Sequence, residues 1–167
     1  EAIVDLTAIA ANVKKLKASS GTDLMAVVKA DAYGHGLVPV AKAALSGGAT
    51  WLGVALLEEA ISLRKAGITA PILAWLVPPG SDFKAAVESD IDVAVPSLQI
   101  LSELGAVAGA KRPRVHLEVD TGMTRGGFLS EWSEIDAQHL QNVDLIGIFS
   151  HFARADEPGQ KQNLEQL

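Results

Sequence analysis

The stretch LMAVVKADAYGHGLVPVAKAAL, residues 24–45, joins an apolar run to a helical pattern through a loop that contains two glycines. The run at residues 24–29 is nearly continuous in apolar residues, which is typical of a strand covered on both faces. Residues 38–45 show the spacing of an amphipathic helix. This order of strand, loop and helix predicts one unit of a parallel α/β fold.

The same unit recurs along the chain, between breakers such as Gly47-Gly48 and Gly67. Five further strands are predicted at residues 51–56, 72–77, 91–95, 114–119 and 145–149. Helices are predicted at residues 7–18, 57–66, 82–89, 98–106 and 131–140, and residues 157–167 begin another. The predicted N-caps are Thr7, Ser81, Ser97 and Ser130, whose side-chain oxygens can accept from free amides.

Two closures of such a sheet are possible, an open doubly wound sheet and a (β/α)8 TIM-type barrel. No strand is followed by Gly-x-Gly-x-x-Gly or a Walker motif, which are the usual nucleotide motifs of open sheets. Polar residues instead end several strands, as in barrel enzymes: Lys29, Glu118, Asp120 and His151. A complete barrel needs eight units and about 250 residues. We therefore predict a barrel truncated to about six units, with a small six-stranded open sheet as the alternative.

Composition narrows the possible functions. The chain has 167 residues, 14 Lys and Arg against 20 Asp and Glu, a net charge of −6 and no cysteine. This acidic balance argues against a nucleic-acid surface, and the missing cysteines exclude disulfides, a thiol nucleophile and cysteine-ligated zinc. The longest uncharged stretch, residues 66–81, holds three prolines and two glycines and is therefore no membrane helix. We expect no membrane association, and a cytoplasmic protein is the simpler interpretation.

Lys29 is the first candidate for chemistry, because an amine at the end of an apolar strand is suited to Schiff-base formation. The following glycines allow close approach of a ligand, and the N-terminus of the helix near Val38 favours an anion such as phosphate. The alternative is a lysine that extends into solvent before a glycine-rich turn.

A second candidate is the segment Asp120-Thr121-Gly122-Met123-Thr124-Arg125, which directly follows a strand. Arg125 is suited to binding a carboxylate or a phosphate, although Asp120 could simply cap a tight loop. His151 follows the last strand, where a structural hydrogen bond is the alternative to a catalytic role. His35 and His116 are assigned no role.

Two acidic pairs, Glu58-Glu59 and Glu131 with Glu134, are interpreted as solvated helix faces. No cluster of histidines and carboxylates has the spacing of metal ligands, so we expect no metal.

Together these segments resemble alanine racemase, a fold-type III enzyme that uses pyridoxal 5'-phosphate (PLP). The resemblance rests on residues 26–36 (AVVKADAYGHG), on residues 120–125 and on Phe149-Ser150-His151-Phe152-Ala153 with Asp156. The opening segment with Val4, Asp5 and Leu6 is also similar to that family's entry into its barrel. The resemblance implies racemisation of L-alanine to D-alanine, which supplies cell-wall peptidoglycan, in a protein that forms a homodimer.

The resemblance also implies residue roles. Lys29 would form the Schiff base with PLP and act as the base on one face of the substrate, and Tyr33 would reach the cofactor phosphate. Arg125 would lie near the phenolic oxygen of PLP and the substrate carboxylate, with His151 beside the cofactor ring. Many family members carry a carbamylated lysine two residues before Asp120. This chain has Glu118 there, and we expect Glu118 to supply that anion by pairing with Arg125.

The family's second acid/base is a tyrosine in a C-terminal β-domain, whereas the one tyrosine of this chain is Tyr33. We therefore expect residues 1–167 to be the N-terminal part of a longer enzyme, inactive alone. Three alternatives stay open: another fold-type III enzyme such as an amino-acid decarboxylase, a racemase for larger amino acids, and a non-catalytic PLP-binding module.

Overall fold

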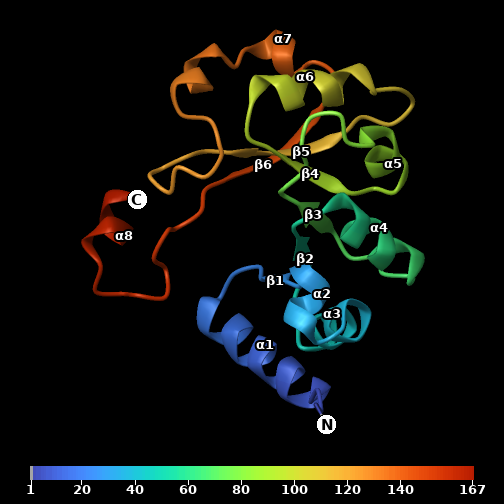
Figure 1. Cartoon of the computed structure of the whole chain (residues 1–167), viewed down its shortest axis with the longest axis vertical. Coiled ribbons are helices and arrows are strands. Elements are labelled where there is room, and N and C mark those ends of the chain that lie inside the picture. The colour runs from blue at the N-terminus through green and yellow to red at the C-terminus, as the bar shows by residue number, and fades with distance from the viewer. Residues whose placement is uncertain (1) are drawn as a thin grey trace. The chain divides into compact units, whose positions relative to one another are not determined.

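The computed structural model describes residues 2–167, which form two compact units. The first unit runs up to Val77 and includes Glu88–Asp92. The second contains Pro78–Val87 and Val93–Leu167. Each unit is an α/β structure, with parallel strands that alternate with helices along the chain (Figure 1).

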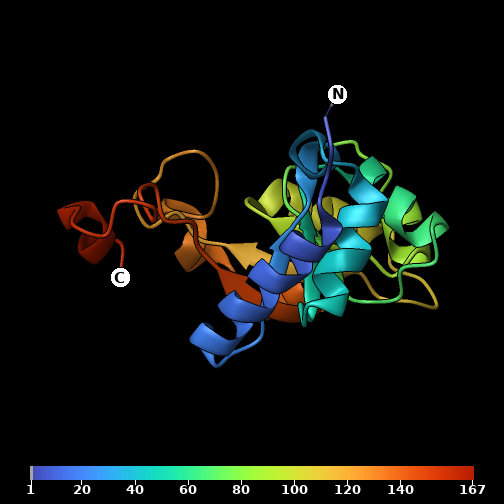
Figure 2. The ribbon, with the colours of Figure 1, turned by 90° about the horizontal axis from the view of Figure 1, so that it is seen from below.

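The first unit is built on three parallel strands, β1 (Met25–Val27), β2 (Trp51–Val54) and β3 (Ile72–Ala74). β2 pairs with β1 on one side and with β3 on the other. The helices of this unit are α1 (Leu6–Ser20), α2 (Lys29–Gly34), α3 (Leu37–Ser46) and α4 (Leu57–Lys65). α1 and α3 lie side by side (Figure 2). Every residue of β3 is buried, as the continuous apolar run predicts for a strand covered on both faces.

The second unit is built on β4 (Asp92–Val95) from Val93 onward, on β5 (Arg114–Glu118) and on β6 (Asp144–Phe149), and β5 pairs in parallel with both neighbours. Its helical segments are α5 (Phe83–Glu88) up to Val87, α6 (Leu98–Ala106), a 3-10 helix at Ser130–Glu134, α7 (Ala137–Leu140) and α8 (Lys161–Glu165). β4 is buried throughout, whereas most of β6 is exposed. Leu101, Leu104 and Val115 are fully inaccessible to solvent and form part of the core.

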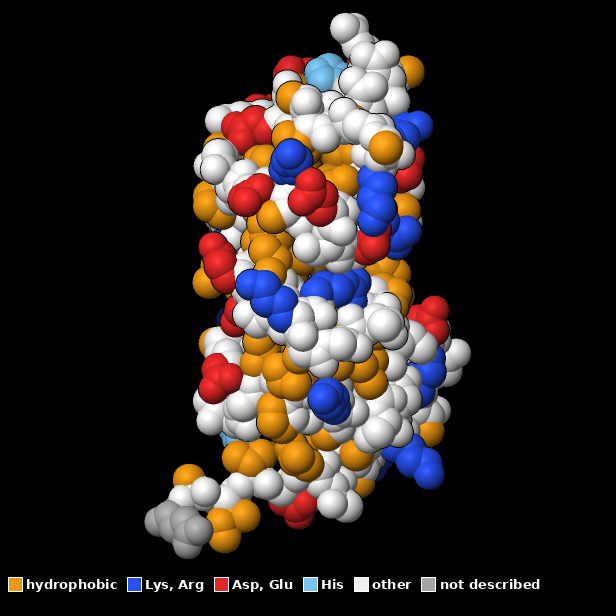
Figure 3. Space-filling view, turned by 90° about the vertical axis from the view of Figure 1, so that its right-hand side faces the viewer, with side chains coloured by type: hydrophobic (Ala, Val, Ile, Leu, Met, Phe, Trp, Pro, Cys, Tyr) orange, Lys and Arg blue, Asp and Glu red, His pale blue; other side chains and the backbone are white. Residues whose placement is uncertain are grey.

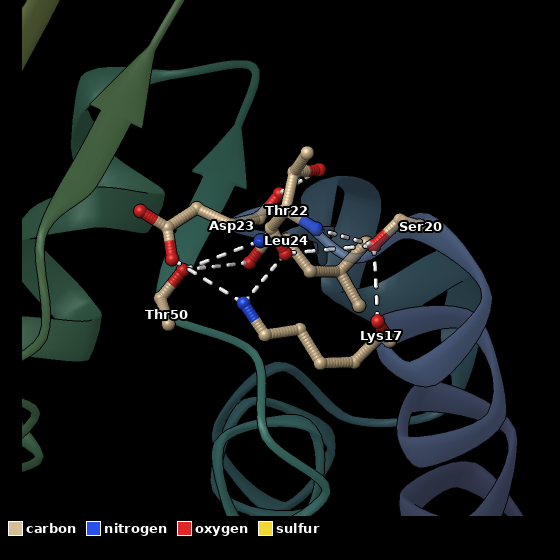
Figure 4. Close-up of polar contacts among 6 residues, drawn as sticks. All are labelled: Lys17, Ser20, Thr22, Asp23, Leu24 and Thr50. Carbon is tan, nitrogen blue, oxygen red and sulfur yellow. Dashed lines mark hydrogen bonds and ion pairs between the residues drawn. The ribbon is translucent and has the colours of Figure 1, made fainter.

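A group of polar contacts joins the C-terminal end of α1 to the connection that leads into β1 (Figure 4). The Nζ of Lys17 donates to the carbonyl oxygen of Thr22 at 2.6 Å and lies 3.3 Å from the carboxylate of Asp23. Gly21 ends the helix with a φ of +64°, a conformation that glycine adopts without steric cost. The predicted N-cap Thr7 is wrong. Asp5 caps α1 and accepts from the amides of Thr7 and Ala8, because the chain turns two residues earlier.

All six predicted strands are present. Five of them are shorter than the apolar runs suggest, whereas β6 begins one residue earlier than predicted, at Asp144. Ser97 caps α6 as predicted. Ser81 does not cap α5, because its hydroxyl donates to the carbonyl oxygen of Pro78, and Asp82 accepts from the amide of Ala85 instead. Ser130 is the first residue of a 3-10 helix and not its cap.

The helix predicted at residues 131–140 is wrong as a single element. It is divided by Ile135, which is extended, and by Asp136, whose carboxylate accepts from the amides of Gln138 and His139 to start α7. The N-cap residue of a helix has extended backbone, so Asp136 starts a new helix and cannot continue the preceding one.

Among residues 2–167, no helix is both long and apolar enough to cross a membrane. The face in Figure 3 carries Lys and Arg side chains interspersed with Asp and Glu.

Candidate functional site

Lys29 lies two residues beyond β1 and is the first residue of α2. The strand was predicted to continue to Lys29, but it ends at Val27, and Val28, with 1% of its surface exposed, marks the transition. Lys29 itself is half-buried. The amide of Val28 donates to the carbonyl oxygen of Gly53 at 2.8 Å, so the residue before Lys29 is held against the end of β2.

The backbone after Lys29 forms a left-handed turn of four residues without glycine. Ala30, Asp31, Ala32 and Tyr33 have φ angles of 53°, 54°, 52° and 56°. Left-handed helical backbone costs about 1–2 kcal/mol for each such residue, because Cβ approaches the following carbonyl oxygen. Runs of strained backbone of this kind cluster at functional sites, where the surrounding structure maintains them.

Hydrogen bonds within the segment help to hold this turn. The amide of Ala32 donates to the carbonyl oxygen of Val28 at 2.9 Å, and the amide of Gly36 donates to that of Asp31 at 2.9 Å. Ala32 is buried, whereas Tyr33 retains 61% of its surface. The turn therefore leaves the phenol of Tyr33 accessible to a ligand.

One amide at the N-terminus of α3 already binds an anion of this chain. The Asp31 carboxylate accepts from the amide of Leu37, the first residue of α3, at 2.7 Å. The expected use of this helix end for a phosphate is therefore wrong for that amide, because the chain supplies its own carboxylate.

Glu59 was interpreted as part of a solvated helix face, and this is wrong. Its side chain is half-buried and accepts from the amides of Ala30, Ala55 and Leu56. The position of a glutamate three residues after the helix N-cap could have indicated the bond to Leu56. Nothing in the sequence pattern indicates the bond to Ala30, which lies 29 residues away.

In the second unit, residues 119–128 form a loop directly after β5. The loop is closed by two hydrogen bonds, from the amide of Phe128 to the carbonyl oxygen of Glu118 and from the amide of Asp120 to that of Phe128. Phe128 is 1% exposed and anchors the closure in the core. Gly127 has a φ of +112°, and a Cβ there would lie 2.7 Å from the Asp120 nitrogen, so only glycine fits.

The two carboxylates at the start of this loop have opposite electrostatic surroundings. Burial raises the pKa of Glu118, and this effect outweighs the attraction of the nearby Arg125 guanidinium, which acts in the other direction. The amides of Thr124 and Gly122 donate to Asp120 and lower the pKa of its carboxyl group. Asp120 therefore shapes the loop, whereas Glu118 is a carboxylate held at a cost in stability.

Glu118, Asp120, Arg125 and His151 line one small pocket in the second unit, together with Ser150 and the loop backbone. Arg125 and His151 are exposed. The structure thus brings together four of the six predicted site residues, while Lys29 and Tyr33 lie in the first unit.

Sequence reasoning missed two contacts around this pocket. The hydroxyls of Thr121 and Ser150 lie 2.7 Å apart, which ties the loop after β5 to the end of β6. Gln166 is buried, with its amide nitrogen 3.0 Å from the carbonyl oxygen of His151 and its oxygen accepting from Ala153. Both contacts join distant segments, so no local pattern could have revealed them.

The predicted site residues suit PLP chemically. The first unit offers the amine of Lys29 and the phenol of Tyr33, and the second offers the guanidinium of Arg125 and the imidazole of His151. All four residues are exposed or half-buried. In residues 2–167 no group of three or more histidines and carboxylates is arranged to hold a metal ion.

The chain is similar to known alanine racemases over its whole length. It is 50% identical to the alanine racemase of Salinispora tropica and 46% identical to that of Thermobifida fusca, covering 100% of this chain and 47% of each relative. It thus spans under half the length of these relatives. The crystal structure of alanine racemase from D-cycloserine-producing Streptomyces lavendulae matches 98% of this chain with 45% identity and a TM-score of 0.93, covering 45% of that protein.

This match assigns the alternating strands and helices to the N-terminal barrel portion of such structures, so the open-sheet alternative is wrong. The family model described as alanine racemase, N-terminal domain, matches residues 4–167. The chain belongs to the alanine racemase N-terminal domain family.

Proposed function

We propose that this chain is the PLP-binding part of an alanine racemase that converts L-alanine to D-alanine for cell-wall peptidoglycan. The observation that carries the proposal is Lys29, a half-buried residue that lies two residues beyond β1 and immediately precedes the strained turn at Ala30–Tyr33. Family membership supports the same activity, which its relatives' names state. The proposed activity is that of the whole protein, because this chain spans under half the length of its relatives.

Removal of the α proton of an amino acid requires that the negative charge left on the carbon be stabilised. When bound, PLP supplies that stabilisation as an electron sink. Lys29 would hold the cofactor through Nζ, and the same amine would accept the α proton on one face of the substrate. The accessible phenol of Tyr33 would donate to the cofactor phosphate.

In the second unit, the Arg125 guanidinium would bind the substrate carboxylate, and His151 would lie beside the cofactor ring. Glu118 would orient Arg125 as an unmodified anion, which the lowering influence of Arg125 on the pKa of Glu118 supports. A buried carboxylate beside a cation, at a cost in stability, is typical of functional sites.

Inversion of the α carbon requires a second acid on the opposite face. Tyr33 is the one tyrosine of the chain and is assigned to the phosphate. We therefore propose that the second acid lies outside these residues, in the complete homodimeric protein.

The first test is covalent labelling of the complete protein that contains this chain. PLP is added, the protein is reduced with borohydride, and the labelled peptide is mapped. We expect one label per chain on Lys29 and none on the exposed Lys42, because only Lys29 lies in a structured site. The Lys29→Ala variant should lose the label.

Two results would contradict the proposal. Label spread over many lysines would reject Lys29 as the attachment point. Label on Lys29 without exchange of the α proton of alanine for solvent deuterium would favour a non-catalytic PLP-binding protein.

A further inference from the structure

The left-handed turn at Ala30–Tyr33 decides where two of the proposed cofactor ligands lie. Lys29 immediately precedes it and Tyr33 is its last residue, so any change in the φ angles of the turn moves both side chains. An L-residue chain does not adopt four such angles in succession unless other contacts impose them.

The Glu59 carboxylate makes the side-chain contact to the first residue of this turn. Its Oε1 accepts from the amide of Ala30 at 2.6 Å, and its Oε2 accepts from the amides of Ala55 and Leu56 at 3.0 Å each. One carboxylate therefore joins the start of the turn to the connection between β2 and α4. Hydrogen bonds from amides to a charged acceptor are short and about twice as strong as neutral ones.

Glu59 is itself held firmly. It lies in the first turn of α4, whose apolar face is buried through Leu57, Ala60 and Leu63. Because α4 is packed through these residues, the position of the Glu59 carboxylate is restricted, and it can hold the turn in place. Its half-buried side chain also limits competition from water.

Capping of α4 alone does not account for this arrangement. A glutamate at this position satisfies the helix end by accepting from the N-cap amide, here that of Leu56. The bond to Ala30 is the shortest of the three and reaches a residue that is not part of the helix. It is therefore directed at the turn.

We propose that Glu59 is a positioning residue that fixes the Ala30 amide, and through it the left-handed turn, so that Lys29 and Tyr33 are preorganised for the cofactor. This inference rests on the proposed function, since it assumes that Lys29 and Tyr33 bind PLP.

The test compares Glu59→Gln with Glu58→Gln in the complete protein. Glu58 is the adjacent, exposed acid of α4 and serves as the matched control for loss of charge. A glutamine at 59 keeps the shape but replaces one acceptor oxygen by a donor, which then faces an amide N–H. Two quantities are measured: the PLP concentration for half-maximal borohydride labelling of Lys29, and amide hydrogen exchange across residues 29–36 without PLP.

We expect Glu59→Gln to raise the half-maximal PLP concentration about tenfold and to speed exchange in the turn about tenfold, because a charge-assisted hydrogen bond is lost. Glu58→Gln should change neither. Labelling of Lys42 in the same samples should stay equal, since a purely structural loss of folding would raise it. If Glu59→Gln fails to fold, Glu59→Asp, which is too short to reach both sides, is measured in the same way.

The outcomes separate this inference from the proposed function. If the parent protein labels at Lys29 but Glu59→Gln behaves like Glu58→Gln in both measurements, the positioning role is rejected and the proposed function stands. If the parent does not label at Lys29, the proposed function fails. Hydrogen exchange then still decides whether Glu59 holds the turn, and unchanged exchange would reject that role too.

Discussion

At the scale of single residues, Glu118 is a carboxyl group that the fold buries although burial destabilises its charged form. Its side chain is 7% exposed, and burial raises its pKa above the ordinary value of 4.5. The folded state thus binds the Glu118 proton more tightly than the unfolded state does. The contribution of this residue to stability therefore decreases as the pH rises through the window between 4.5 and the higher folded-state pKa.

We predict that Glu118→Gln stabilises the protein at neutral pH, because the neutral amide avoids the desolvation of a charge. The melting temperature should rise by about 2 °C or more near pH 7 and converge with that of the parent in acid. Thermal unfolding followed by circular dichroism at a series of pH values would measure this. A lower melting temperature at neutral pH would show that the attraction of Arg125 outweighs burial.

The stability that Asp120 contributes should depend on pH in the opposite direction. Its pKa is lowered by the amides of Thr124 and Gly122, so its charged form stabilises the folded state above its ordinary value of 3.8. This stability is lost as the pH falls through the lower folded-state pKa. Asp120→Asn should therefore lower the melting temperature at neutral pH, and an unchanged value would contradict the role of the carboxylate in shaping the loop.

At the scale of elements, Arg64 fastens the end of α4 to two neighbouring connections of the first unit. Its guanidinium donates to four carbonyl oxygens, those of Ile68, Ala70, Ser89 and Asp90, at distances of 2.7–2.9 Å. Only the planar fork of an arginine can serve several acceptors in this way.

We predict that Arg64→Ala costs about 2 kcal/mol of unfolding free energy, because several partly buried carbonyl oxygens lose their donor. Lys65→Ala, at the exposed neighbouring position, is the control and should change stability by less than about 0.5 kcal/mol. Denaturant unfolding of both variants would measure the difference. Equal stabilities would mean that water replaces the guanidinium without loss.

Also at this scale, the apolar pattern of the sequence predicts where the strands and helices lie, but it does not predict where each of them ends. α6 has the predicted bounds, because its serine cap and apolar face agree locally. The strand predicted at residues 24–29 ends early because the left-handed turn begins after Lys29, and the apolar run gives no sign of that turn.

At the scale of the whole molecule, β6 is the least covered of the strands. Its side chains Leu145, Ile146 and Ile148 are 42%, 39% and 57% exposed. Exposed apolar residues on a strand favour association with other chains.

We predict that residues 1–167, produced alone, self-associate, and that Ile148→Lys reduces this association by placing a charge on β6. Leu164→Lys, at a 75% exposed position of α8, is the control for added charge. Light scattering at equal protein concentrations would compare them. Equal scattering by the two variants would show that β6 is not the surface of association.

The sequence by itself determined the alternation of strands and helices, the family resemblance and the choice of six candidate site residues. These follow from local periodicity and short motifs, which depend on neighbours along the chain. Tertiary structure decided the left-handed turn after Lys29, the three amides that Glu59 accepts from and the burial of Glu118. The physical reason is that burial and hydrogen bonds between residues such as Ala30 and Glu59 exist only once distant segments have packed together.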